Sequence, residues 1–410
     1  MVATCAGVTV ANIYLAFSMI TLFAESFGVP AAQAASVATI SQIGYAVGLF
    51  FLIPLGDAVR RKRLLTVLIS GATVGLAVAS LAPNIQTLSI ATFVLSGLTV
   101  APHVLIPLLI SIVPVDFRGR ALATVSAAMT TGIAASRVGS AWLGGTIGWH
   151  WVYAVAGAAT ALVGVITILV LPREAERPRI KYGRLLKSTL ALLRDEPRLR
   201  WSIGLQMPIF ATFNLVWSML ILLLTAEPYN LPVAVAGLSG LLGLAPLITA
   251  RWFGRMLDFR GSDVVISAGI AALVTAGVLL QFSLLSLGIV IASVILLAIG
   301  QQAAGVGNQA RTLALRADAR ARLNTLYMTS NFLGGSLASG VAVVVYADLG
   351  WSGIAATGLA TALVALIVWL ADLRVHATSK SAVRGDGGLG AGGRLSGDAE
   401  STLVRPTPEE

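Results

Sequence analysis

Lysine and arginine residues are confined to short segments of this chain, and long apolar stretches separate those segments. Of the 28 Lys and Arg residues, 27 fall in six segments, which hold 4, 2, 9, 3, 4 and 5 of them. Each pair of successive segments brackets enough apolar sequence for two membrane crossings. This alternation is the positive-inside pattern of a polytopic membrane protein, so it predicts cytoplasmic loops wherever the basic residues gather. The basic segments are 60–63, 118–120, 173–200, 251–260, 311–322 and 374–405.

Composition supports a membrane protein and argues against other classes. The chain is 57% hydrophobic and 11% charged, whereas soluble domains average about 25% charged residues. A net charge of +10 could indicate nucleic-acid binding, but the basic residues are spread over alternate loops instead of forming one patch. We therefore expect them to anchor loops at the anionic leaflet, with the lipid bilayer and not nucleic acid as the partner. The single Cys5 permits no internal disulfide and by itself no metal site, so no metal and no cofactor are predicted.

Twelve apolar segments are long enough to cross a bilayer, which takes about 20 residues. The basic segments follow every second one, so both termini are predicted in the cytoplasm of a multi-pass protein of the cell (inner) membrane. The start of the chain has no basic region and is interpreted as the first crossing, not as a cleaved signal peptide. The approximate segments are 4–24, 34–56, 64–82, 86–113, 121–145, 150–171, 202–225, 233–255, 264–283, 285–308, 323–346 and 351–372.

The two halves of the chain repeat one another at an almost constant offset of 202 residues. Asn12 recurs as Asn214, and an Asp-x-Arg-x-Arg motif that begins at 116 recurs at Asp318. Six crossings per half make the repeats parallel, which places a solute site between the halves near mid-membrane. The predicted fold is therefore all-α, with 12 transmembrane helices in two pseudo-symmetric six-helix bundles.

The predicted bundles cover residues 1–172 and 201–376, and a cytoplasmic central loop covers 173–200. Leucines and basic residues interleave in this loop, which fits either an amphipathic helix on the membrane surface or an ordinary charged linker. The Gly-, Ser- and Pro-rich stretch 377–410 is predicted to be a disordered cytoplasmic tail.

Residues after the second predicted crossing resemble the signature of the major facilitator superfamily, and the resemblance covers residues 1–376. The signature is Gly-x-x-x-Asp-[Arg/Lys]-x-Gly-Arg-[Arg/Lys]. Residues 53–62 read Ile-Pro-Leu-Gly-Asp-Ala-Val-Arg-Arg-Lys, and the second copy at 254–261 keeps both glycines and the Asp. Segments such as Ala-Asn-Ile-Tyr at 11–14 are similar to the bacterial 12-helix drug and sugar efflux (drug:proton antiporter) branch. The fifth helix departs from the antiporter motif, because its glycines are present, its Pro is absent and Arg137 is added.

The resemblance implies a secondary active transporter, monomeric and not an enzyme, that moves a small organic solute by alternating access. Its expected mode is efflux coupled to protons. In this family the loop aspartate helps to latch the two halves on the cytoplasmic side, which a carboxylate can do by accepting hydrogen bonds from arginine. The alternative is that the basic residues only anchor the topology. The implied latch residues are Asp57, Arg61, Asp258, Arg260, Arg118, Arg320 and Arg322.

Arg137 is the one basic residue inside an apolar stretch. A charge at the middle of a membrane helix costs about 2.5–3.5 kcal/mol on insertion scales, so it must face the bundle interior or a watery cavity. We interpret it as an electrostatic element of the central cavity that attracts an anionic group or acts on a titratable partner. The alternative is a structural pin that donates hydrogen bonds to carbonyls of neighbouring helices.

His103 is the one other titratable group predicted deep in a helix, because no Asp or Glu lies at the centre of a predicted crossing. An imidazole with a pKa near 6.5 could take and release protons, although a lone His in a helix is more often satisfied by a carbonyl. Other polar or amphipathic residues are expected to line the cavity or to join helices by hydrogen bonds. The candidates are Asn12, Tyr14, Asn214, Trp217, Tyr327 and Asn331.

Four other functions are weighed against the sequence. A carrier that works without protons, as a facilitator or in uptake, is favoured by the missing buried carboxylate. A membrane-bound enzyme is disfavoured because the chain holds three His and one Cys, and ATP-driven transport because no Gly-x-x-x-x-Gly-Lys-[Ser/Thr] loop occurs. A non-transporting receptor or scaffold on a transporter fold is not excluded by sequence.

Overall fold

The computed structural model describes residues 1–114, 117–171 and 182–386, apart from the side chains at positions 57, 110, 111, 118, 119 and 376–386. The chain divides into two compact units, Met1–Val368 and Trp369–Glu410. The first unit contains the cavity described below. The second begins inside the last helix.

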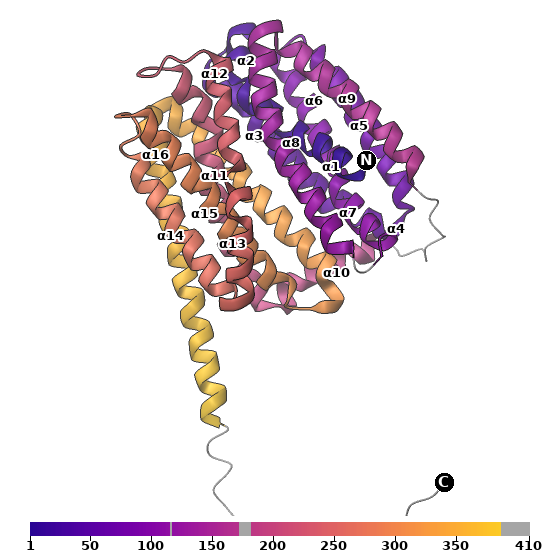
Figure 1. Ribbon diagram of the computed structural model, residues 1–410, viewed down its shortest axis with the longest axis vertical. Coiled ribbons are helices and arrows are strands. Elements are labelled where there is room, and N and C mark those ends of the chain that lie inside the picture. The colour runs from indigo at the N-terminus through magenta and orange to yellow at the C-terminus, as the bar shows by residue number, and fades with distance from the viewer. Residues whose placement is uncertain (115–116, 172–181, 387–410) are drawn as a thin grey trace, which may run out of the picture. The chain divides into compact units, whose positions relative to one another are not determined.

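Helices account for nearly all of the described residues, as predicted for an all-α membrane protein. The helices that precede the central loop are α1 (Val2–Ala11), η1 (Asn12–Ser18), α2 (Ile20–Phe27), α3 (Ala31–Leu52), α4 (Leu55–Ala58), α5 (Arg61–Ser80), α6 (Ile85–Leu98), α7 (Ala101–Ile112), α8 (Arg118–Ile147) and α9 (Trp149–Val170) (Figure 1). The remaining helices are α10 (Tyr182–Asp195), α11 (Pro197–Thr225), α12 (Val233–Ala236), η3 (Gly237–Leu244), α13 (Ala245–Arg260), α14 (Ser262–Leu280), α15 (Leu287–Leu313), η4 (Ala317–Ala319) and α16 (Arg320–Asp386).

Three of the predicted crossings are interrupted. The first bends by 57° between Val2–Ser18 and Ile20–Phe27, and its middle part, η1, is a 3₁₀ helix. The eighth has a second 3₁₀ helix, η3, at its middle. The fourth is divided into α6 and α7. Since a 3₁₀ turn inside a longer helix often marks a hinge, η1 and η3 are places where the crossings can change shape.

The described residues include nine helices that are long and apolar enough to cross a membrane, or up to ten if the bent first pair is one span. The count of twelve crossings stays a prediction. It requires that α16 crosses twice, on either side of Gly350, where the backbone leaves the helical region. It also requires that α8 crosses, although its small and polar residues and Arg137 lower its hydropathy.

Close backbone contacts hold the helices of the first unit together. Before the central loop, α3 packs on α6, α5 on α9, and α1 on α8; after it, α14 and α11 both pack on α15. A Cβ atom at Gly48 would lie 2.1 Å from the carbonyl oxygen of Gly97, and one at Gly132 would lie 2.3 Å from that of Gly7. Small residues at these crossings allow helices to approach at backbone distance, the usual packing of membrane helices.

The two groups of helices meet at α8 and α11. Helix α8 packs on η3 and α12, and α11 contacts α2, α3 and η1. These contacts join elements from before and after the central loop. The domain boundaries that we place at 172 and 201 stay predictions.

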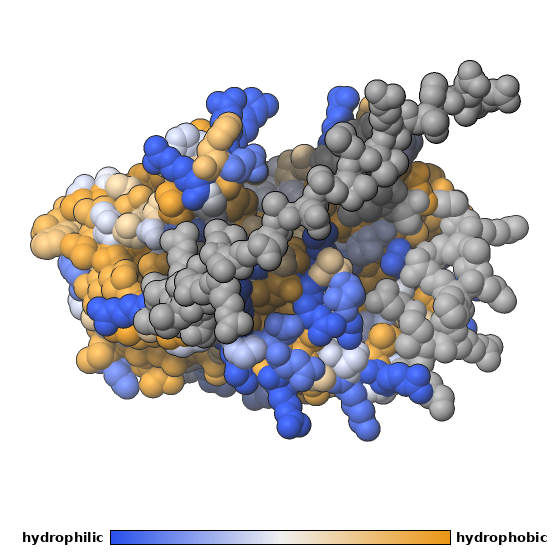
Figure 2. Space-filling model, turned by 90° about the horizontal axis from the view of Figure 1, so that it is seen from below, coloured by the Kyte–Doolittle hydropathy of each residue, from blue (hydrophilic) through white to orange (hydrophobic). Residues whose placement is uncertain are grey.

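The central segment contains a helix, and its packing differs from both interpretations left open by its sequence. In α10, Leu192 is buried in a small core with Leu199, Ala319, Leu323 and Leu326. Helix α10 therefore packs on the protein next to the start of α16, and it is neither an unstructured linker nor a helix resting on lipid alone. Figure 2 looks onto this end of the molecule. Hydrophilic side chains face the viewer, and hydrophobic ones are most visible at the left edge of the view.

The last helix extends beyond its predicted end. Helix α16 continues to Asp386, past the boundary predicted at 377, because Ala, Val, Lys and Arg in this stretch are compatible with a helix. The rest of the predicted disordered tail, 387–410, lies outside the described residues.

Candidate functional site: a central cavity

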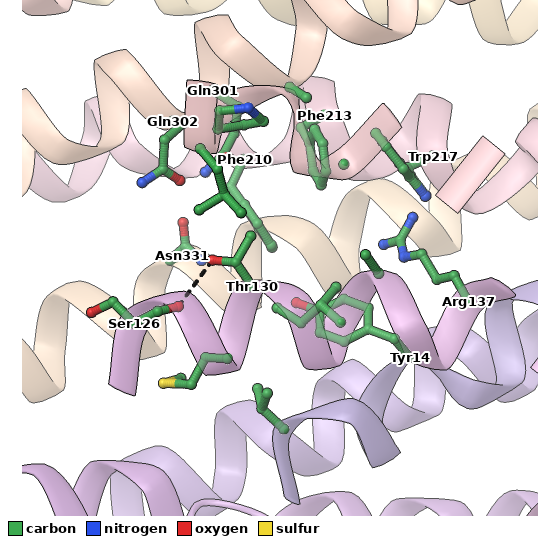
Figure 3. A pocket seen from close by; sticks show the side chains of 18 of the residues that line it. Tyr14, Ser126, Thr130, Arg137, Phe210, Phe213, Trp217, Gln301, Gln302 and Asn331 are labelled. Atoms are coloured by element: carbon green, nitrogen blue, oxygen red, sulfur yellow. Dashed lines mark hydrogen bonds between the residues drawn. The ribbon is translucent and has the colours of Figure 1, made fainter. Parts of the chain in front are cut away.

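A cavity of about 570 Å³ lies between the helices that precede and follow the central loop. This volume falls in the range of about 300–1,000 Å³ that is typical of small-molecule sites. The cavity is lined mainly by apolar and aromatic side chains, with a few polar groups among them (Figure 3). Its lining comes from α1, η1, α3, α7 and α8 on one side and from α11, η3, α13, α15 and α16 on the other.

One face of α8 forms a long wall of the cavity. Ser126, Thr130, Ile133 and Arg137 line it at helical spacing, and a rise of 1.5 Å per residue gives this stripe a length of about 16 Å. Ser126 is exposed and Thr130 half-buried, whereas Arg137 is 3% exposed. The cavity therefore opens toward the start of α8, at the basic segment 118–120, and closes at Arg137.

Three aromatic rings surround the guanidinium group of Arg137 at the closed end. Its Cζ atom is 4.4 Å from the ring centre of Trp217, 5.1 Å from that of Tyr14 and 5.5 Å from that of Phe17. Tyr14 and Phe17 come from η1 and Trp217 from α11, so the two halves of the chain share this cation. Desolvated cation–π contacts can each contribute about 2 kcal/mol, which helps to explain how the charge is tolerated there.

The rings do not satisfy the hydrogen-bonding groups of Arg137. Its Nε and Nη1 atoms are buried and have no hydrogen-bond partner among the described residues. A buried donor without an acceptor costs about 1–3 kcal/mol. The predicted alternative, a pin that hydrogen-bonds helix carbonyls, finds no support at these two atoms.

Glycines of η3 allow α8 to close this end of the cavity. A Cβ atom at Gly237 would lie 2.1 Å from the Cβ atom of Ala141, and one at Gly240 would lie 2.7 Å from that of Arg137. A second void, with a volume of about 10 Å³, lies against Arg137 and Trp217 and is also lined by Ser18 and Leu220. A space this small holds one water molecule at most, so Arg137 and Trp217 stand between the large cavity and the tightly packed end.

Aromatic rings continue from Trp217 along the cavity. The ring centres of Trp217 and Phe213 are 4.9 Å apart, and those of Phe213 and Phe210 are 6.0 Å apart. The Phe332 ring lies 5.4 Å from Phe210 and packs edge-on against Tyr45 at 4.5 Å. The wall opposite α8 is thus a row of rings suited to an apolar or aromatic body.

His103 lies at the end of this row of rings. Its Nε2 atom is 2.9 Å from the hydroxyl oxygen of Tyr45, and both residues line the cavity. Which of the two atoms donates depends on the tautomer of the imidazole. The pair is a hydrogen-bonded, titratable group in contact with the cavity.

Five of the eight residues predicted for the cavity line it, namely Arg137, His103, Tyr14, Trp217 and Asn331. The other three lie behind the lining. Asn12 donates to the Thr160 hydroxyl at 3.0 Å within its own half. The Tyr327 hydroxyl, which has one proton to donate, lies 2.5 Å from Gln206 Oε1 and 2.7 Å from the Gly305 carbonyl oxygen.

Asn214, the repeat partner of Asn12, joins the two halves. Its amide and that of Gln42 exchange two hydrogen bonds, at 2.7 and 2.9 Å, and Asn214 Nδ2 also donates to the Gly335 carbonyl. Both side chains are fully buried. Positions that match in the repeat therefore have different partners, a difference that the repeat itself does not reveal.

The predicted latch is described only in part. The side chains of Asp57 and Arg118 lie outside the described residues, Arg61 begins α5, and Asp258 and Arg260 are exposed at the end of α13. Arg320 begins α16, and nearby Asp318 accepts two hydrogen bonds from Arg316, at 3.2 and 2.8 Å. These bonds hold the pKa of the Asp318 carboxyl below its ordinary value.

Two further contacts complete this ion-pair cluster. Arg322 Nη2 lies 3.9 Å from the Asp318 carboxylate, and Arg316 Nη1 lies 4.0 Å from Glu196, which precedes α11. The cluster ties the start of α16 to the start of α11, and both belong to the second half. Exposed pairs of this kind contribute little to stability, and a latch between the halves stays a prediction.

Sequence reasoning missed much of the aromatic lining. Phe210, Phe213 and Trp217 follow one another at spacings of three and four residues, which places them on one face of a helix. The same spacing relates Met328 to Asn331 and Phe332. This periodicity was available in the sequence, but it does not distinguish a cavity wall from an ordinary core.

Comparisons with known proteins agree with this arrangement. The family model described as Major Facilitator Superfamily matches residues 2–337. A protein described as a probable transporter of Streptomyces coelicolor is 35% identical over 358 residues, 87% of this chain and 83% of that protein. The uncharacterized transporter YgaY of Escherichia coli O157:H7 is 30% identical over 369 residues, 90% of this chain and 94% of that protein.

Solved structures of transporters share the fold at low identity. The nucleoside transporter NupG matches with a TM-score of 0.69 and 13% identity, over 91% of this chain and 99% of that one. A D-xylose-proton symporter matches with a TM-score of 0.67 and 15% identity, over 90% of this chain and 96% of that one. At such identities the likeness concerns the fold alone.

Proposed function

The chain belongs to the Major Facilitator Superfamily and is a multi-pass membrane transporter of that type, and from this premise we propose that it moves a small organic solute by alternating access. The observation that carries the proposal is the cavity itself. Both halves of the chain line it, and it is open at the basic end and closed at Arg137. If the basic loops are cytoplasmic, as the positive-inside rule predicts, this is an inward-facing state.

The closed end has the features of a gate. Close packing of Gly237 on Ala141 and the contact of Arg137 with Trp217 join the two halves there. Neither is a covalent or ion-pair link, so a rocking movement of one half can separate both. The 3₁₀ helices η1 and η3 lie at these contacts and supply backbone that can adjust during the movement.

The proposed mode is efflux coupled to protons, with His103 as the proton site. The hydrogen bond between His103 and Tyr45 places an ionisable imidazole at the cavity surface. Proton movement is sufficient in energy, because each charge crossing 100 mV yields about 2.3 kcal/mol.

The alternative function is transport without protons, as a facilitator or in uptake. One observation favours it: the described residues that line the cavity include no Asp or Glu. Proton coupling would then depend on the single imidazole of His103.

Everted membrane vesicles test the two modes. A panel of organic solutes is added to vesicles that hold a proton gradient, and the loss of the gradient is followed for wild type and His103→Ala. We expect wild type to exchange protons for at least one solute and His103→Ala to lose this exchange. The expected loss is about a hundredfold or more, which is the range for a lost proton-transfer group.

Tyr45→Phe is the matched control, because it removes the hydrogen bond to His103 and keeps the imidazole. It should retain proton exchange with a shifted pH profile. Full proton-driven exchange in His103→Ala would remove His103 from the mechanism. Solute exchange in wild type without any proton movement would favour the facilitator.

A further inference from the structure

We propose that the solute is an amphipathic organic anion whose charged group binds Arg137 and whose apolar body lies along the row of rings. The inference deepens the proposed function and rests on it, since it assigns the chemical class of solute to the same cavity. It follows from the charge of the lining, from the free donors of one buried residue and from the shape of the wall between the two ends.

The charge of the lining favours an anion. Among the described residues that line the cavity, Arg137 is the one Lys or Arg, and there is no Asp or Glu. A cationic solute would meet a buried positive charge with no carboxylate to compensate it. An anionic group would neutralise that charge in a place shielded from water, where the attraction is strongest.

The free donors of Arg137 favour an anionic group that accepts hydrogen bonds. Nε and Nη1 are buried without a hydrogen-bond partner among the described residues, on a side chain that is 97% buried and lines the cavity. A carboxylate, sulfonate or phosphate accepts charge-assisted hydrogen bonds from guanidinium N–H groups, and these are roughly twice as strong as hydrogen bonds between neutral groups. Such a group would supply the acceptors that the three surrounding rings lack.

The wall between Arg137 and the open end favours an apolar body. Phe213, Phe210 and Phe332 follow Trp217 along it, as Figure 3 shows in part. Neutral amide and hydroxyl groups gather at the open end, where Gln301, Gln302 and Ser126 also line the cavity. A fitting solute therefore carries its anionic group at one end, an apolar or aromatic middle, and no second charge.

Binding of matched compounds to the purified full-length protein tests the class. The probes are benzoate, 2-naphthoate and 4-phenylbutyrate, each compared with its primary amide and with the amine of the same skeleton. We expect at least one carboxylate to bind tenfold or more tightly than its amide, and the amines to bind most weakly. Inorganic phosphate should bind far more weakly than that carboxylate, because it has no apolar body.

Variants of Arg137 test whether this residue causes the preference for a carboxylate over its amide. Arg137→Gln should bind carboxylate and amide equally, and Arg137→Lys should keep part of the preference, because a charge remains but the planar fork is lost. Ser136→Ala is the matched control, since it removes another buried polar side chain of α8 that does not line the cavity. It should keep the full preference of wild type.

Three outcomes would overturn the inference: no carboxylate binds better than its amide, phosphate binds as well as the best carboxylate, or Arg137→Gln keeps the preference. These outcomes are separate from failure of the proposed function. If the protein transports a neutral or cationic solute by alternating access, it is a transporter, but the solute class inferred here is wrong. A protein that binds anions through Arg137 and never changes its access keeps the inference and loses the function.

Discussion

A single buried cation, shared by rings from both halves, is the residue that best characterises this cavity. Arg137 belongs to α8, and Trp217, whose ring is nearest, belongs to α11. The sequence identified Arg137 as a candidate because a charge in an apolar helix must find a special environment, and Trp217 as an amphipathic residue of a predicted crossing. It could not pair them, since they lie 80 positions apart in the printed sequence and no local pattern relates them.

Substitution of Trp217 should lower the thermal stability of the protein mainly because it removes the contact with Arg137. We expect thermal stability in detergent to fall from wild type to Trp217→Phe and further to Trp217→Leu, because the attraction of a ring for a cation decreases in that order. In an Arg137→Met background the difference between Phe and Leu at 217 should largely disappear. The coupling expected from this double-mutant cycle is about 2 kcal/mol.

Phe332→Leu is the control for this cycle. Its ring belongs to the same row but packs on Tyr45 and Phe210, and it is not among the three rings around Arg137. The loss of thermal stability that it causes should be the same whether Arg or Met stands at position 137. An undiminished effect of Trp217→Leu in the Arg137→Met background would show that Trp217 acts by packing alone.

Interrupted crossings are the main result at the scale of elements. The sequence predicts one helix over 4–24 and one over 233–255, whereas the structure bends the first and places a 3₁₀ segment in each. The apolar runs are continuous at both places, so hydropathy alone cannot show the interruption. At the second place η3 packs closely on α8, and that packing depends on residues distant in sequence.

Gly237→Ala should open the closed end. The added methyl group would lie 2.1 Å from the Cβ atom of Ala141, and overpacking of this kind costs about 1–3 kcal/mol. The cost falls on the closed state alone, because the contact is lost when the gate separates. The ratio of open to closed gates should therefore rise about tenfold or more, which labelling of a cysteine at this end would measure.

Gly254→Ala provides a matched control in the same crossing. A Cβ atom at Gly254 would meet nothing within 4 Å, so this variant should label like the parent protein. Equal labelling of the two variants would mean that the packing of η3 on α8 does not hold the gate closed.

At the scale of the whole molecule, the alternation of charged loops and the internal repeat predict the class of fold well. Each depends on long-range regularities of composition that membrane insertion imposes. The predicted latch is the weaker part, because loop carboxylates can pair within one half, as Asp318 does with Arg316 and Arg322. The twelve crossings and the two domain boundaries stay predictions.

Access to the cavity from one side at a time is the central claim, and two engineered cysteines in a Cys5→Ser background measure it directly. Ser126→Cys reports on the open end and Ser18→Cys on the closed end. Each is reacted with a membrane-impermeant maleimide in everted and in right-side-out vesicles.

The account predicts that Ser126→Cys reacts from the cytoplasmic side and that Ser18→Cys is protected at rest. Addition of a transported solute from outside, or the Gly237→Ala substitution, should raise labelling of Ser18→Cys from the outer side and lower that of Ser126→Cys. Simultaneous labelling at both ends would indicate a channel, and labelling that no solute and no gate substitution changes would indicate a fixed receptor. Either result would contradict alternating access.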